Sequence, residues 1–300
     1  MISRTKAEAP SLTLPQQTRL DIREGRVTGT AHGRAPGYLV CNLVVIRRAL
    51  ADEFLLYCQR NPQACPLLEV TDPGCSEPKR LAPGSDLRTD LSRYAIYRDG
   101  VREEDREDIV DVWENDFVAF LIGSGISFDG ALERAGVPTT GNRWVVRTKL
   151  QTVPVGRFHG PMAVTMRWLT PAQAITAVQV TSRFPACHGA PIHIGDPELI
   201  GADLKQPLFG PVVPPIPKGL IAVFWPCGVT PQEAALAAKI DLMITHAPGH
   251  GFITDIEAER FVQKNFQRNR QLHGHPPSLA VDELYVATFA HPQLHVDGQG

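Results

Sequence analysis

The segment between residues 219 and 252 constrains the fold of this chain more than any other part of it. An apolar run at residues 220–225 is followed by a turn, a helix-like segment and a second apolar run at residues 242–245. The helix is predicted to begin at Pro231, because Thr230 supplies an N-cap hydroxyl and proline suits the first helical position. Two short apolar runs joined by a helix predict a β-α-β unit with parallel strands and a right-handed crossover.

The two loops that follow these runs carry reactive side chains. The strands of a parallel unit end at one edge of the sheet, which is where open α/β sheets bind ligands. Cys227, Gly228, His246 and His250 are therefore expected to meet at that edge. Backbone amides at a helix start favour an anion and lower the pKa of a nearby thiol, and imidazoles exchange protons near neutral pH. Cys227 is thus either a reactive thiol or, as a cysteine after a strand often is, a packing residue.

A second stretch concentrates His188, His193 and Asp196 among glycine and proline residues around a very short strand. Such a composition is typical of a loop that builds a site rather than of a core. We expect this loop to pack against residues 246–250 and to form one pocket with them, across the proline-rich connector at residues 207–218.

A third feature is a buried strand at residues 117–122 that runs into a glycine turn containing Ser124 and Ser127. A strand, a glycine turn and a helix start predict a second anion-binding cradle. Phe128 stands where a dinucleotide-binding fingerprint requires its third glycine, so a nicotinamide cofactor is not expected.

Composition excludes several classes of function. The 300 residues are 43% hydrophobic, with a net charge of only −2 and scattered basic residues, so nucleic-acid binding is not expected. No stretch has the apolar length of a transmembrane helix and the N-terminus has no signal core, which predicts a cytoplasmic protein without membrane contact. The six cysteines include no Cys-x-x-Cys pair, so reduced thiols are expected.

Local patterns also predict the organisation of the chain. Residues 47–60 form an amphipathic helix that ends before Pro62, and residues 171–179 form a second capped helix. The mixed-charge run at residues 98–111 predicts a solvated loop and a helix start. The expected parts are a flexible arm at 1–20, an α/β region at 21–206, the connector at 207–218, the β-α-β unit at 219–257 and a divergent tail at 258–300.

Several motifs together resemble one known family. The segments PGYLVCNLVVI, WENDFVAFLIG, RFPACHGAPIHIGDPELIG, FWPCGVTPQ and ITHAPGH are similar to the D-glutamate cyclase family of hydro-lyases, in order and over residues 37–255. The resemblance implies an α/β fold, with a three-layer α/β/α sandwich around a mixed sheet and a smaller two-layer α+β subdomain near residues 140–206. It also implies conversion of D-glutamate into 5-oxo-D-proline and water, or a reaction of a related small carboxylate.

Cyclising glutamate requires a base, an acid, donors for a developing oxyanion and a cation for a carboxylate. His246 and His250 are the expected acid/base pair, and His188 and His193 are the alternative pair. The amides near Gly228 suit the oxyanion. Arg147 and Arg183 are candidates to bind a substrate carboxylate. Each is equally well explained as part of a structural ion pair. For substrate contacts we add Ser124, Ser127 and Asp196.

Two other interpretations remain open. The five residues His188, His193, Asp196, His246 and His250 contain the ligand types of a divalent metal site, which leaves a metal-dependent lyase or hydrolase as an alternative. A non-catalytic carboxylate-binding regulatory protein would use the same amide cradles. Histidines favour chemistry over simple anion capture, so an enzyme that acts on a small carboxylate or amino acid without a cofactor is the preferred prediction, and a homo-oligomer is compatible with it.

Overall fold

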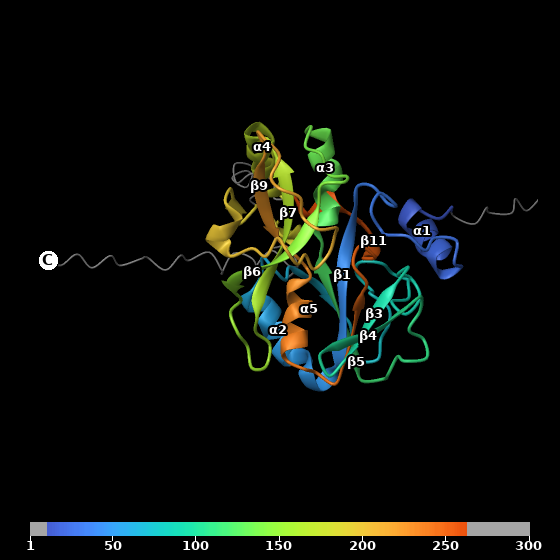
Figure 1. Cartoon of the computed structure of the whole chain (residues 1–300). Helices are drawn as coiled ribbons and strands as arrows, with labels where there is room; N and C mark the ends of the chain where they lie inside the picture. The colour runs from blue at the N-terminus through green and yellow to red at the C-terminus, as the bar shows by residue number, and fades with distance from the viewer. Residues whose placement is uncertain (1–10, 263–300) are drawn as a thin grey trace, which may run out of the picture. The chain divides into compact units, whose positions relative to one another are not determined.

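A computed structural model describes residues 11–262, which belong to one compact unit. The expected α/β class is confirmed: helices pack against two β-sheets (Figure 1). Every strand pairing within residues 11–262 is antiparallel, whereas the sequence predicted a mixed sheet. The predicted tail lies almost entirely outside the described residues.

The larger sheet has seven strands and is built around β1 (Tyr38–Arg47). Eight of the ten residues of β1 are buried, because both faces of the strand are covered. In spatial order the strands are β2 (Leu67–Val70), β5 (Phe117–Gly123), β1, β10 (Leu242–His246), β3 (Tyr94–Arg98) and β4 (Val101–Arg106), with β11 (Phe252–Glu257) also paired to β1.

Strands β10 and β11 share one edge of β1, one after the other. Val44 pairs with Thr245 and Cys41 pairs with Phe252, so three steps along β1 correspond to seven along its partner. The extra residues leave the sheet as the loop 247–251. This interruption places the loop beside the middle of β1, where the loop lines a cavity.

The smaller sheet has four antiparallel strands, in the order β6 (Trp144–Gln151), β7 (Pro161–Leu169), β9 (Ile221–Pro226) and β8 (His193–Ile194). Helices α3 (Asp129–Arg134) and α4 (Pro171–Thr181) share a hydrophobic cluster with β7 and β9. A capping box of Thr170 and Gln173 begins α4, as predicted.

The predicted β-α-β unit is wrong in its pairing. Strand β9 belongs to the smaller sheet and β10 to the larger one, so the two apolar runs are not neighbours. The intervening helix, α5 (Thr230–Ala237), begins within one residue of its predicted start, but the predicted Thr230 cap is wrong: Val229 is the N-cap without a side-chain cap, and the Thr230 hydroxyl bonds the backbone of Ala163. A helix start depends on a few neighbouring residues, whereas the partners of β9 and β10 are distant in the chain and only tertiary packing selects them.

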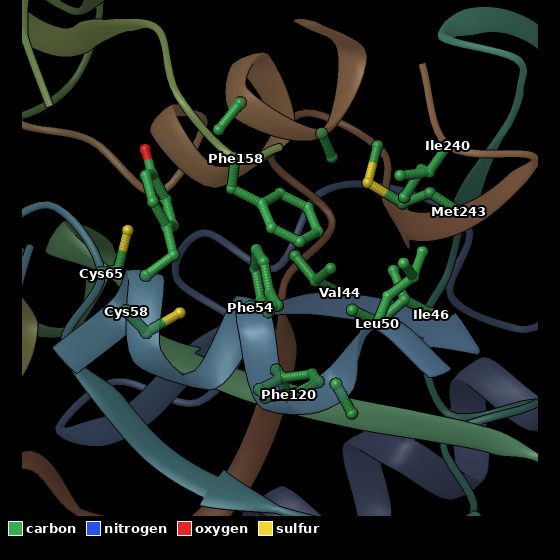
Figure 2. Close-up of a cluster of buried hydrophobic side chains, with 14 of the residues drawn as sticks. Val44, Ile46, Leu50, Phe54, Cys58, Cys65, Phe120, Phe158, Ile240 and Met243 are labelled. Carbon is green, nitrogen blue, oxygen red and sulfur yellow. The ribbon is translucent and has the colours of Figure 1, made fainter. Parts of the chain in front are cut away.

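A large hydrophobic cluster joins the larger sheet to α2 (Arg48–Arg60) and α5 (Figure 2). Phe54 of α2 is fully buried and meets Phe120 of β5 edge to face, with ring centroids 4.8 Å apart. Burying one such ring contributes about 2–3 kcal/mol. The predicted amphipathic helix is therefore confirmed, and it ends at Asn61 as expected.

Two local predictions are corrected. Part of the expected flexible arm forms α1 (Leu14–Arg23), held by the buried Arg19, which donates to the Asp255 carboxylate. The mixed-charge run forms strand β4 at the edge of the larger sheet instead of a loop and helix start. Charged side chains on an edge strand oppose pairing with another chain, which explains why a strand can carry this composition.

Candidate functional site

A cavity opens where the two sheets meet, and it encloses about 730 Å³ of space, part of it open to solvent. The larger sheet contributes Asn42 of β1, the turn after β5 and the loop after β10. The smaller sheet contributes side chains of β6 and β7 and the turn after β9. Its polar lining residues are Asn42, Ser124, Arg143, Thr165, Arg167, His188, Cys227 and His246.

The turn after β9 approaches β1 so closely that only glycine fits. A Cβ atom on Gly228 would lie 1.9 Å from Nδ2 of Asn42. Asn42 is itself oriented by donating from Nδ2 to the Gly123 carbonyl, at 2.9 Å. The absent side chain at Gly228 therefore brings the turn and its backbone amides against the floor of the cavity, as a close backbone approach requires.

His246 ends β10 and lines the cavity. Its Nδ1 accepts a hydrogen bond from the Leu43 amide at 3.2 Å, because the interrupted ladder leaves this amide facing a side chain. A longer contact to the Leu43 carbonyl, at 3.5 Å, is the weaker of the two. Nε2 of His246 then carries the proton. Burial lowers the pKa of His246 to about 4, so the ring is neutral at pH 7.

His188 reaches the same cavity from the loop after α4. Its backbone has φ +78°, a left-handed conformation that is uncommon outside glycine and that points to a functional constraint. Nδ1 donates to the Gln63 carbonyl at 2.9 Å, which leaves Nε2 with a free lone pair. Burial lowers the pKa of His188 to about 4. The two imidazoles are thus both neutral. Nε2 of His188 is a hydrogen-bond acceptor, whereas Nε2 of His246 is a donor.

Two arginines that were not predicted also line the cavity. Arg167 is only 1% exposed, and its Nη2 donates to Oδ1 of Asp129 at 2.5 Å. Arg143 donates to the other oxygen of the same carboxylate, and Nδ1 of His32 lies 3.4 Å from that oxygen. The sequence contained one signal for Arg167: it stands among apolar residues in the buried strand 161–169, and a buried charge requires a partner or a ligand.

Cys227 faces the cavity, but its thiol is not activated in the way predicted. Burial raises the pKa of Cys227 above its ordinary value, and this effect exceeds the opposing hydrogen bonds from Thr165 and the amides of Val229 and Gly228. Those groups stabilise a thiolate less than the loss of water destabilises it. Cys227 is therefore a thiol at neutral pH.

The two other candidate histidines lie outside the cavity lining. His193 of β8 donates from Nε2 to the carbonyl of Asp196 at 2.8 Å and packs on Phe224. Nδ1 of His250 lies 2.8 Å from the Ser92 hydroxyl, which itself donates to the Gly29 carbonyl. The His193 ring holds its own loop together, whereas the His250 ring bonds a serine 158 positions away in the sequence, and Asp196 itself caps a short turn.

The remaining predicted site residues also divide into those that line the cavity and those that do not. Ser124 lines the cavity, whereas Ser127 is buried and exchanges hydrogen bonds with the backbone of Val40. Arg147 is exposed and donates to Glu233 of α5, so its structural explanation applies. Arg183 is exposed and is not among the cavity residues.

The five residues of the alternative metal site are not gathered into one cluster. Within residues 11–262, no group of three or more His, Cys, Asp or Glu side chains is arranged to hold a metal ion. In the same part of the chain, no helix combines the length and apolarity that crossing a membrane requires.

Comparison with known proteins agrees with the resemblance seen in the sequence. Residues 118–255 match the family model for D-glutamate cyclase. A protein of Stutzerimonas stutzeri named "Putative hydro-lyase" is 50% identical over 252 residues, covering 82% of this chain and 95% of its own length. A Bacillus subtilis protein with the same designation is 48% identical over 251 residues, covering 82% and 97%. A nitrogen repressor-like protein of Methanococcus jannaschii aligns with a TM-score of 0.35 and 10% identity, too low for an argument about fold.

Proposed function

The chain belongs to the D-glutamate cyclase family, and on that premise we propose that it is a hydro-lyase that cyclises D-glutamate, or a closely related amino dicarboxylate, with loss of water. One observation carries the proposal beyond the family. A single cavity contains two neutral imidazoles, one with a free Nε2 lone pair and one with an Nε2 proton. Such a pair can accept a proton at one ring and donate a hydrogen bond from the other in the same reaction.

The reaction requires two protons to move from nitrogen to oxygen. In the zwitterionic substrate the α-ammonium group has three protons and the γ-carboxylate has none. The C–N bond forms as nitrogen attacks the γ-carbon, and one γ C–O bond breaks. Nitrogen keeps one proton in the lactam, and the leaving oxygen departs with the other two as water.

The roles of the side chains follow from their ring nitrogens. Nε2 of His188 accepts a proton from the ammonium group, which frees the nitrogen lone pair for attack. The imidazolium of His188 then returns this proton to the departing oxygen, and the second proton passes from nitrogen to the same oxygen by the same route, so His188 ends the reaction neutral. Nε2–H of the neutral His246 donates a hydrogen bond to the departing oxygen and keeps its proton. A bound carboxylate raises the pKa of both rings, which brings proton transfer through His188 closer to neutral pH. The amides of Gly228 and Val229 suit the oxyanion that forms on the γ-carbon.

The test is to incubate the purified protein with D-glutamate and to follow the product by mass spectrometry. We expect a product lighter than the substrate by one water, formed faster than in a protein-free sample. L-Glutamate and D-aspartate are the matched substrates, because they change the stereochemistry and the ring size of the product. Turnover of none of the three amino acids would reject the proposal.

A further inference from the structure

Arg143 and Arg167 have more hydrogen-bond donors in the cavity wall than the protein satisfies. Among the described residues, Nε and Nη1 of Arg167 are buried without a hydrogen-bond partner, and so is Nε of Arg143. Buried guanidinium donors are normally paired, because an unmet donor loses its hydration without compensation. The unmet donors are therefore evidence for a ligand that completes them.

The charges around the two arginines are also unbalanced. Both guanidinium groups pair with the single carboxylate of Asp129. Of the cavity-lining residues within positions 11–262, none is an aspartate or a glutamate. Glu133 also acts on Arg167 through its charge, but within residues 11–262 only Asp129 pairs with the two cations, and a ligand with a negative charge would pair with the donors that remain.

The two arginines are held in place before any ligand binds. Arg167 projects from β7, a strand paired on both sides, and its Cζ lies 5.9 Å from the centre of the Trp225 ring. Asp129 begins α3 and binds one arginine through each of its oxygens. Rigid donors lose little conformational entropy on binding, which favours a planar, two-oxygen ligand.

We propose that Arg143 and Arg167 anchor the carboxylate of the substrate that does not react, with Asp129 as the residue that positions them. This assignment rests on the proposed function for the identity of the ligand. A carboxylate bound by two cations stays ionised and is a poor electrophile, so the anchored group is the α-carboxylate and not the γ-carboxylate that loses oxygen. The γ-carboxylate then extends toward the imidazoles and the Gly228 turn of the same cavity.

Binding of glutarate tests this anchor without turnover, because glutarate has both carboxylates but no amine to cyclise. We expect titration calorimetry to give a Kd that is about 10- to 100-fold higher for Arg167→Met and for Arg143→Met than for the unchanged protein. Arg98→Met is the matched control, since Arg98 is exposed and pairs with Glu103. Its Kd should stay within about twofold of the unchanged protein.

Circular dichroism establishes that each variant is folded. If Arg167→Met does not fold, Arg143→Met decides, because the Arg143 side chain is 20% exposed and tolerates truncation better. Unchanged glutarate affinity in the cavity variants, or no glutarate binding by the unchanged protein, would overturn the anchor. If glutarate binding depends on the arginines but D-glutamate is not turned over, the anchor is supported and the hydro-lyase is rejected. If D-glutamate is turned over but glutarate binding does not depend on the arginines, the hydro-lyase is supported and the anchor is rejected.

Discussion

Two loops of similar composition, residues 188–196 and 246–250, each place one histidine in the cavity and one outside it. In both loops the cavity histidine has its Nδ1 bonded to the backbone of a distant segment, at Gln63 or Leu43. The outer histidines instead bond within their own loop, as His193 does, or bond a side chain, as His250 does at Ser92. Glycine, proline and histidine in a loop thus indicate a site, but only the tertiary contacts decide which ring faces it.

The largest effect should come from removing a cavity histidine. We expect His188→Ala and His246→Ala each to lower kcat for D-glutamate by at least about 100-fold, the usual scale for a proton-transfer group and for a donor to a developing oxyanion. His193→Ala is the matched variant from the same loop as His188, and it should retain activity within about threefold of the unchanged protein. Steady-state kinetics on variants with unchanged circular dichroism would measure the difference. Equal losses at positions 188 and 193 would remove the distinction between the two classes of histidine.

The next prediction uses acid stability. The pKa of His188 and of His246 is about 4 in the folded chain, below the ordinary value of 6.5. Between pH 6.5 and 4 the unfolded chain therefore binds more protons, and stability falls as the pH falls through this window. Each ring contributes on the order of 3 kcal/mol to this loss.

Urea unfolding of the unchanged protein and of His246→Gln at pH 7 and pH 4.5 measures this effect. The variant should lose less stability on acidification than the unchanged protein, because it lacks one of the three histidines whose pKa burial lowers, at positions 188, 246 and 250. His193→Gln should show the full acid loss. The same acid loss in all three proteins would mean that burial of His246 does not control the pH dependence.

The smallest effect is expected at Cys227, which lies in the cavity but has a raised pKa. Attack by the substrate's own amine is already intramolecular, so a covalent thioester is not required. Cys227→Ser should therefore keep kcat within about tenfold of the unchanged protein, well above the histidine variants. An inactive Cys227→Ser together with active histidine variants would favour a thioester route through the thiol.

The sequence by itself determined the features that depend on a few neighbouring residues. The capped start of α4, the start of α5, the buried face of α2 and the strand β5 all occur close to where local patterns predicted them. The same patterns located both site-forming loops and the Gly228 turn. Capping and periodicity act within one or two turns of chain, so they can be recognised without knowledge of the fold.

Only the tertiary structure decided the partners of these elements. It assigned β9 and β10 to different sheets, and it joined Leu43 to His246 across 203 positions of sequence. It also brought Arg143 and Arg167 onto one carboxylate, although the predicted cations were elsewhere. Strand pairing and the pairing of buried charges depend on burial and on residues far away in the chain, and a local pattern contains no information about either.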